Sequence, residues 1–200
     1  SDLGLNAGTY LAHFLSHYAF QHQAQALLHQ LGDVYHRDVF AANIGLAYHD
    51  QIMGDLTMNV GQTVYRQGQE GYIRIQFRYP VGMSETTILT QIQRHVGPLK
   101  AKIFKEVQFG SQPHMVDLND VIVTKLQNIY AQQTNTDKTY KISNGGSYAR
   151  LLKRGVAFGG QFPNLPVMSH QPDEYVLLSN ISRAQAIFAQ ALYELAETTT

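Results

Sequence analysis

The sequence predicts an α+β protein built from two compact parts. In some stretches apolar residues recur at steps of three and four, which is typical of helices with one buried face. In others they alternate with polar residues, which is typical of half-buried strands. Hydrophobic residues make up 44% of the 200 residues, which is enough for a core. Because this length exceeds what one compact unit needs, we expect two domains, residues 1–109 and 110–200.

The first part is expected to begin with a helix and a β-hairpin. Residues 7–32 carry apolar side chains at helical spacing, and we expect this helix to break near residues 20–21. The alternating residues 56–60 and 73–77 flank a turn at residues 67–71. Two alternating runs joined by a short polar turn predict a hairpin.

A helix and a third strand are expected to follow the hairpin. The second strand stops at Pro80, because proline cannot donate to a β-ladder. Ser84 and Thr87 open a helix that ends at residues 97–98, and residues 100–109 form a third strand. This series predicts a ferredoxin-like sandwich, with helices packed on a mainly antiparallel sheet, that lacks its first strand.

The second part has a different order of elements. After residues 110–113 we expect a helix over residues 115–133, a short strand, a glycine-rich turn, a helix, a strand and a final helix over residues 180–196. Strands that alternate with helices are typical of an α/β segment. The domain boundary is therefore placed at the Gly-Ser-Gln-Pro run.

The composition argues against several classes of partner. Lysine plus arginine number 15 and aspartate plus glutamate number 15, so no net charge draws the chain to nucleic acid or to anionic lipid. No apolar run approaches the roughly 18 residues that span a bilayer. The absence of cysteine and of a signal peptide fits the cytoplasm. Since the chain begins at Ser1 without methionine, we expect a processed product or an expressed fragment.

The nine histidines make a metal site one hypothesis. His13 and His17 lie at i and i+4, but the residue after His13 is aromatic, so the His-Glu-x-x-His pattern of helical zinc peptidases is absent. His170 lies in a predicted loop with Asp173 and Glu174, an arrangement that suits a metal ligand with carboxylate partners. A loop histidine hydrogen-bonded to either carboxylate is the alternative.

Two glycine-bearing runs allow binding hypotheses. Residues 144–150 form a turn before a predicted helix, so their amides can point at a carboxylate; a plain turn and helix cap is the alternative. Residues 154–159 weakly resemble the aromatic strand of RNA-binding domains. There, however, Val156 replaces the first aromatic residue and Gly159 replaces an aliphatic one. The neutral net charge also argues against RNA.

Several blocks of the sequence carry a family resemblance when taken together. They are residues 6–31, 49–56, 78–82, 144–150, 154–159, 168–175 and 186–193. In this order they resemble the C-terminal part of PepV-type (Xaa-His) dipeptidases, which belong to the aminoacylase and carboxypeptidase family of co-catalytic zinc enzymes. The resemblance implies the latter part of a lid domain over residues 1–109, followed by the C-terminal segment of a catalytic domain over residues 110–200.

The resemblance also implies roles for five residues. His170 matches a histidine that binds one of two zinc ions. Arg78 matches an arginine that grips the substrate carboxylate, for which a guanidinium fork is suited; a surface cation is the alternative. Gly145, Gly146 and Ser147 match a turn that lines the substrate site and offers backbone donors. The asparagine before them stands where the family has glycine.

The remaining machinery implied by the resemblance has no counterpart in this chain. The other zinc ligands, the general-base glutamate and the histidine that stabilises the oxyanion belong to an N-terminal segment, so no catalytic residue is expected here. The implied whole enzyme is a metallo-dipeptidase whose zinc-activated water attacks dipeptides with a free C-terminal carboxylate. We expect this chain alone to be inactive. Two alternatives stay open: a stand-alone ferredoxin-like module for dimerisation or regulation, and an RNA-binding module.

Overall fold

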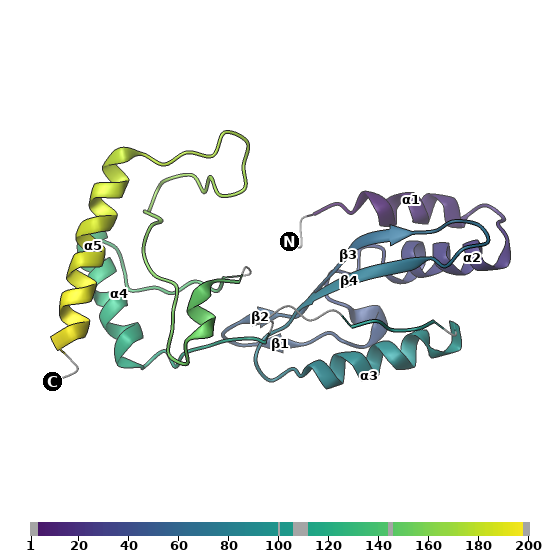
Figure 1. The fold of residues 1–200 in the computed structure, drawn as a ribbon, viewed down its shortest axis with the longest axis horizontal. Coiled ribbons are helices and arrows are strands. Elements are labelled where there is room, and N and C mark those ends of the chain that lie inside the picture. Colours follow the sequence, from purple (N-terminus) through teal and green to yellow (C-terminus); the bar gives the residue numbers. More distant parts are fainter. Residues whose placement is uncertain (1–3, 100, 106–111, 144–145, 198–200) are drawn as a thin grey trace. The chain divides into compact units, whose positions relative to one another are not determined.

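A computed structural model gives the fold of the chain (Figure 1). The structure describes residues 4–99, 101–105, 112–143 and 146–197. The chain divides into two compact units, Ser1–Val107 and Gln108–Thr200, which are described separately. The expected boundary between residues 109 and 110 lies outside the described residues. No helix within the described residues is long and apolar enough to cross a membrane.

The first unit begins with helices that break where the sequence predicts. Helix α1 covers Ala7–Ser16 and α2 covers His22–His29, which continues into a π-helical turn, η1, over Gln30–Val34. The side chain of Asn6 caps α1 by accepting a hydrogen bond from the Thr9 amide at 3.1 Å. Asn6 also donates to the carbonyl of Val60 at 2.7 Å, so the start of α1 is fastened to the neighbouring strand.

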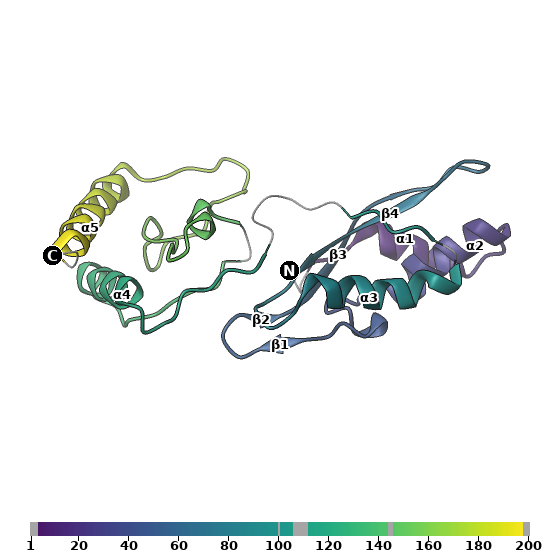
Figure 2. The same cartoon turned by 60° about the horizontal axis from the view of Figure 1, so that its bottom comes forward.

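The predicted hairpin is confirmed. Strand β3, Thr57–Val64, pairs antiparallel with β4, Tyr72–Arg78, and Thr57 lies opposite Arg78. A bulge between Val60 and Gln62 shifts the register. A second, shorter pair precedes it, formed by β1, His49–Asp50, and β2, Gly54–Asp55. In Figures 1 and 2 this short pair lies at the end of the β3–β4 hairpin that is opposite to its turn and to α2.

Helix α3 also forms where the sequence places it, over Glu85–Val96. The hydroxyl of Ser84 accepts a hydrogen bond from the Thr87 amide at 3.0 Å and caps the helix. One face of α3, the helices α1 and η1, and the inner face of the hairpin share a single apolar core. Its buried members are Ala12, Leu31, Tyr35, Ala41, Ile44, Leu46, Leu56, Met58 and Ile88. Burial of this core holds the hairpin on the helices.

The third strand expected over residues 100–109 is wrong for residues 101–105, the part of it that the structure describes. These residues form no β pairing. Lys105 instead makes an ion pair with Glu85 at the start of α3, so this segment is held by the helix. Within the described residues the larger sheet has two strands only. The α+β class stands, whereas the ferredoxin-like arrangement is not confirmed.

The second unit is built on two helices that lie side by side (Figure 1). Helix α4 covers Val121–Thr134 and α5 covers Leu178–Ala196. Their apolar faces meet in a core of buried residues, which are Leu126, Ile129, Phe162, Ile187 and Ala191. Helix α4 begins six residues later than predicted, because the carboxylate of Asp120 caps it by accepting from the Ile122 amide at 2.8 Å.

The α/β pattern expected for the second unit is wrong for the described residues, in which no strand is present. Residues 136–143 form no ladder, and the helix expected after the glycine turn is one turn of 3₁₀ helix, η4, over Tyr148–Leu151. Val156 and Phe158, from the run that weakly resembles an RNA-binding strand, pack on the α4–α5 core. A strand needs a neighbour to satisfy its amides and carbonyls, and none of the described segments pairs with these residues.

Candidate functional site

Arg78 ends β4 on the polar face of the hairpin. The alternation of the strand turns Phe77 toward the core and Arg78 outward, as it turns Met58 inward and Thr57 outward on the facing strand. The side chain is exposed, and its guanidinium makes no hydrogen bond or ion pair with residues that the structure describes. A planar cation in this state is available to a carboxylate ligand.

The short β1–β2 pair brings a histidine and a carboxylate to the same end of the hairpin. His49 lies directly opposite Asp55, and its Nδ1 is 2.7 Å from Asp55 Oδ1. The neighbouring Asp50 accepts hydrogen bonds from the amides of Met53 and Ile52, which hold the pKa of its carboxyl below the usual range. The sequence around His49 indicates no role for this side chain. Only the cross-strand register, which the sequence does not show, joins it to Asp55.

Two contacts join the β1–β2 pair to the segment that follows Arg78. The Val81 amide donates to the sulfur of Met53 at 3.4 Å. Gly82 has a φ of 89°, and a Cβ added there would lie 2.3 Å from the hydroxyl of Tyr48. Only glycine allows both this backbone conformation and this close approach. The β1–β2 pair is therefore packed against the turn that leaves β4.

His170 lies in an exposed turn of the second unit, between η4 and α5. Its backbone is left-handed, with a φ of 64°, and Asp173 has a φ of 58°. The His170 amide donates to Oε2 of Glu174 at 3.4 Å, whereas its imidazole makes no hydrogen bond or ion pair with the described residues. The expected alternative, an imidazole bonded to Asp173 or Glu174, is not observed. The ring is free to bind a ligand.

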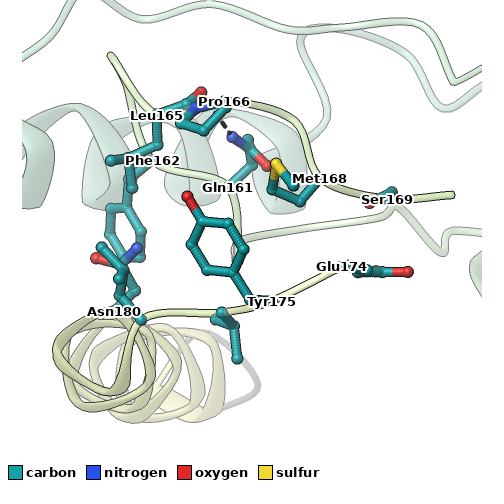
Figure 3. Close-up of a pocket in the computed structure, with 12 residues that line it drawn as sticks. Gln161, Phe162, Leu165, Pro166, Met168, Ser169, Glu174, Tyr175 and Asn180 are labelled. Carbon is teal, nitrogen blue, oxygen red and sulfur yellow. Dashed lines mark hydrogen bonds between the residues drawn. The ribbon is translucent and has the colours of Figure 1, made fainter. Parts of the chain in front are cut away.

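A small pocket lies beside this turn. Its volume is about 220 Å³, and it is bordered by the loop residues before and after His170. Figure 3 shows the ring of Tyr175 between Phe162 and Met168, with Glu174 and Ser169 at one side. The lining combines apolar side chains with several polar ones, and Glu174 is the only charged residue among them.

The described residues do not form a complete metal centre. No group of three or more histidine, cysteine, aspartate or glutamate side chains that could hold a metal ion is present among them. His170 fits the role of a single imidazole ligand. A zinc site in a protein needs three or four ligands, so any zinc bound by His170 requires donors from elsewhere.

The glycine turn is only partly described. Gly145 lies outside the described residues. Gly146 and Ser147 are exposed, and a Cβ added to Gly146 would lie 3.0 Å from Nη1 of Arg150. Ser147 precedes η4, but its side chain makes no capping hydrogen bond. A four-residue 3₁₀ turn presents a much smaller dipole than the helix that the sequence predicted.

The remaining histidine pair and the RNA hypothesis find no support in the geometry. Nδ1 of His13 lies 2.9 Å from the Gly32 carbonyl and Nδ1 of His17 lies 2.8 Å from the His13 carbonyl, so each ring already has a backbone partner. Phe158, the aromatic residue of the supposed RNA-binding strand, contacts the rings of Tyr130 and Phe188. It packs on helices instead of standing on an exposed sheet, as base stacking requires.

Comparison with known proteins relates the chain to dipeptidases. No family model matches it. It is 32% identical over 194 residues to a Beta-Ala-Xaa dipeptidase of Lactobacillus delbrueckii subsp. lactis. The aligned residues make up 97% of this chain and 41% of that protein. It is also similar to two proteins named provisionally as dipeptidases. These are YtjP of Bacillus subtilis, 34% identical over 194 residues, and a protein of Staphylococcus haemolyticus, 35% identical over 196 residues.

The extent of these matches defines how the chain relates to the dipeptidases. Nearly all of the 200 residues take part, but they span 41% of the length of each of these relatives. The shared identity crosses both units, so it is not limited to one of them. A stand-alone regulatory module is not favoured, since the relatives carry the names of enzymes.

Proposed function

We propose that these 200 residues are part of a zinc-dependent dipeptidase of the PepV (Xaa-His) type, which hydrolyses dipeptides with a free C-terminal carboxylate. The observation that supports this most is the similarity to dipeptidases over 97% of the chain. The chain spans 41% of those proteins, so the proposed activity is that of a longer protein in which these residues are joined to the remainder.

Arg78 is proposed to bind the substrate's C-terminal carboxylate. Its guanidinium is exposed and unpaired among the described residues, and it ends a strand whose inward side chains pack on the core. A guanidinium fork can donate two parallel hydrogen bonds to one carboxylate, which fixes the position of the dipeptide as well as its charge. In the second unit, Gly145, Gly146 and Ser147 are proposed to bind substrate through backbone donors, as the family resemblance implies.

His170 is proposed to supply one zinc ligand. The ring projects from a turn whose backbone is held by the contact between the His170 amide and Glu174, and it has no described partner that metal binding would have to displace. Zinc, when bound, would supply the activated water for hydrolysis. The other ligands, the general base and the group that stabilises the oxyanion are proposed to come from outside these 200 residues. This chain alone is therefore proposed to be inactive.

The experiment compares the complete protein with the 200-residue chain. Both are assayed for release of free amino acids from alanyl-alanine and alanyl-histidine, with and without a zinc chelator. We expect the complete protein to hydrolyse both dipeptides, to lose activity with the chelator and to regain it with added zinc, whereas the 200-residue chain has no activity. A complete protein that hydrolyses neither dipeptide, or one that is unaffected by the chelator, contradicts the proposal.

A further inference from the structure

Three side chains with binding chemistry gather at one end of the β3–β4 hairpin: His49, Asp55 and Arg78. Arg78 lies opposite Thr57, and Asp55 is two residues before Thr57. The buried Leu56 lies between Asp55 and Thr57, so both of these face outward. Asp55 therefore lies two residues along the chain from the cross-strand partner of Arg78, on the same outward face.

The orientation of His49 follows from its partner. Nδ1 of the ring lies 2.7 Å from the Asp55 carboxylate, which can only accept, so Nδ1 carries the proton of this hydrogen bond. The other nitrogen, Nε2, is left for a ligand, and the His49 side chain is 64% exposed. A carboxylate that holds one nitrogen of a histidine fixes the direction in which the other nitrogen points.

The β1–β2 pair is held in place by more than the hydrogen bond between His49 and Asp55. Tyr48, the residue before β1, packs against Gly82, and the Val81 amide donates to the sulfur of Met53, the residue before β2, so the chain just before each strand contacts the turn that follows Arg78. The backbone that carries His49 and the backbone that carries Arg78 are therefore joined on both sides. Such support allows two side chains to act on one small ligand.

We propose that His49, positioned by Asp55, binds the substrate's C-terminal carboxylate together with Arg78. This inference rests on the proposed function of Arg78 and adds a second binding residue to it. A charged imidazole can donate from Nε2 to one carboxylate oxygen, while the guanidinium donates to the other. His49 is then a residue that touches the substrate, and Asp55 is a positioning residue that acts through it. The site selects ligands with a free α-carboxylate over the corresponding amides.

The test uses the complete protein and two substrates, alanyl-alanine and alanyl-alaninamide. His49→Ala is expected to raise KM for alanyl-alanine about 10- to 100-fold, the effect of one charge-assisted hydrogen bond, and to leave kcat within about twofold. For the amide, KM should not change. Asp55→Asn should raise KM for alanyl-alanine less than His49→Ala does. The double variant should resemble His49→Ala, because Asp55 acts only through His49.

The chain offers a matched control. His29 and Asp33 form an exposed pair of the same kind, with Nδ1 and Oδ2 2.7 Å apart and side chains 60% and 40% exposed. Figures 1 and 2 show α2, which carries His29, at the opposite end of the hairpin from β1–β2. His29→Ala should leave KM for both substrates unchanged. Thermal melts of all variants separate a loss of binding from a loss of folding, and His49→Gln, which keeps a side-chain N–H donor, should recover part of the affinity.

The outcomes distinguish this inference from the proposed function. A wild-type protein that hydrolyses neither substrate overturns both. If the wild type is active and Arg78→Ala raises KM for alanyl-alanine only, but His49→Ala raises KM for neither substrate or for both equally, the role of His49 is wrong and that of Arg78 stands. A selective effect of His49→Ala on alanyl-alanine, absent in His29→Ala, supports the inference.

Discussion

Arg154 forms a bidentate ion pair with Asp120, which lies 34 residues earlier in the sequence. Its Nε and Nη2 atoms donate to the two oxygens of the Asp120 carboxylate at 2.9 and 2.8 Å. The same carboxylate caps α4 by accepting from the Ile122 amide. One side chain thus begins a helix and anchors the loop that follows η4, a loop that continues into the core of the second unit through Phe158.

This contact predicts how the second unit responds to acid. The hydrogen bonds from Arg154, and then the one from the Ile122 amide, hold the pKa of Asp120 below its ordinary value of 3.8. Because the pKa is lower in the folded state, the stability that this group contributes is present above pH 3.8 and is lost as the pH falls through the folded-state pKa.

Replacing Asp120 should therefore change both stability and its pH dependence. Asp120→Asn is expected to lower the melting midpoint by a few degrees at neutral pH, where the carboxylate is ionised, and to change it little at a pH well below 3.8. Thermal melts between acid and neutral pH measure this. Asp137→Asn, an exposed substitution beyond the end of α4, is the control. Equal losses at all pH values would contradict the assignment.

The core between α4 and α5 should depend on Ile187. This side chain is 1% exposed and lies in the α4–α5 core, whereas Leu192 on the same helix is 72% exposed. Ile187→Ala is expected to lower the free energy of unfolding of the second unit by about 3 kcal/mol, through lost apolar burial and the cavity that remains. Leu192→Ala should change it by less than about 0.5 kcal/mol in the 200-residue chain. Urea unfolding followed by circular dichroism compares the two variants.

Any side chain at Gly82 is predicted to destabilise the first unit. Gly82→Ala places a Cβ against the hydroxyl of Tyr48 and forces alanine to a φ of 89°, which together should cost about 1–3 kcal/mol. Tyr48→Phe removes the hydroxyl but not the strained φ, so the double variant should recover part of the loss. Full recovery would mean that the steric contact alone excludes a side chain. Gly68→Ala separates the steric effect from the conformational one. An added Cβ there meets nothing within 4 Å, so this variant reports the cost of a positive φ alone.

Arg78 is predicted to act on the substrate carboxylate alone. In the complete protein, Arg78→Ala should raise KM for alanyl-alanine about tenfold or more, because an ionic hydrogen-bonded pair is lost, and should leave KM for alanyl-alaninamide unchanged. Arg66→Ala, which removes an exposed arginine near the hairpin turn, is the control and should affect neither substrate. A rise of equal size for both substrates would exclude carboxylate recognition.

His170 is predicted to be required for zinc. In the complete protein, His170→Ala should lower the amount of bound zinc, measured by inductively coupled plasma mass spectrometry. Turnover should fall by about 100-fold or more, since a metal-bound water is the proposed nucleophile. His22→Ala removes an exposed histidine on α2 and should change neither quantity. Unchanged zinc content in His170→Ala would refute the role of this residue even if turnover fell.

Local signals account for the elements that the sequence predicted correctly. The hairpin follows from alternating residues around a polar turn, and α3 follows from its Ser84 cap and its apolar spacing. Each depends on residues within a few positions, so each can be recognised without knowing the fold. The sequence predicted the wrong element where a contact with a residue distant in the sequence determines the local structure. Residues 101–105 have a strand-like pattern, but Lys105 is paired with Glu85 and no ladder forms there.

In the candidate site, too, some features follow from local sequence and others depend on contacts between distant residues. By itself the sequence determined the strand that carries Arg78, the outward side of that strand on which Arg78 stands, and the loop position of His170, and it carries the family resemblance that implies a role for both residues. Only the tertiary structure decided that His49 lies opposite Asp55 and that Tyr48 and Met53 pack against the turn after Arg78. The physical reason is that strand register and the packing of turns depend on the whole core, and no short stretch of sequence contains that information.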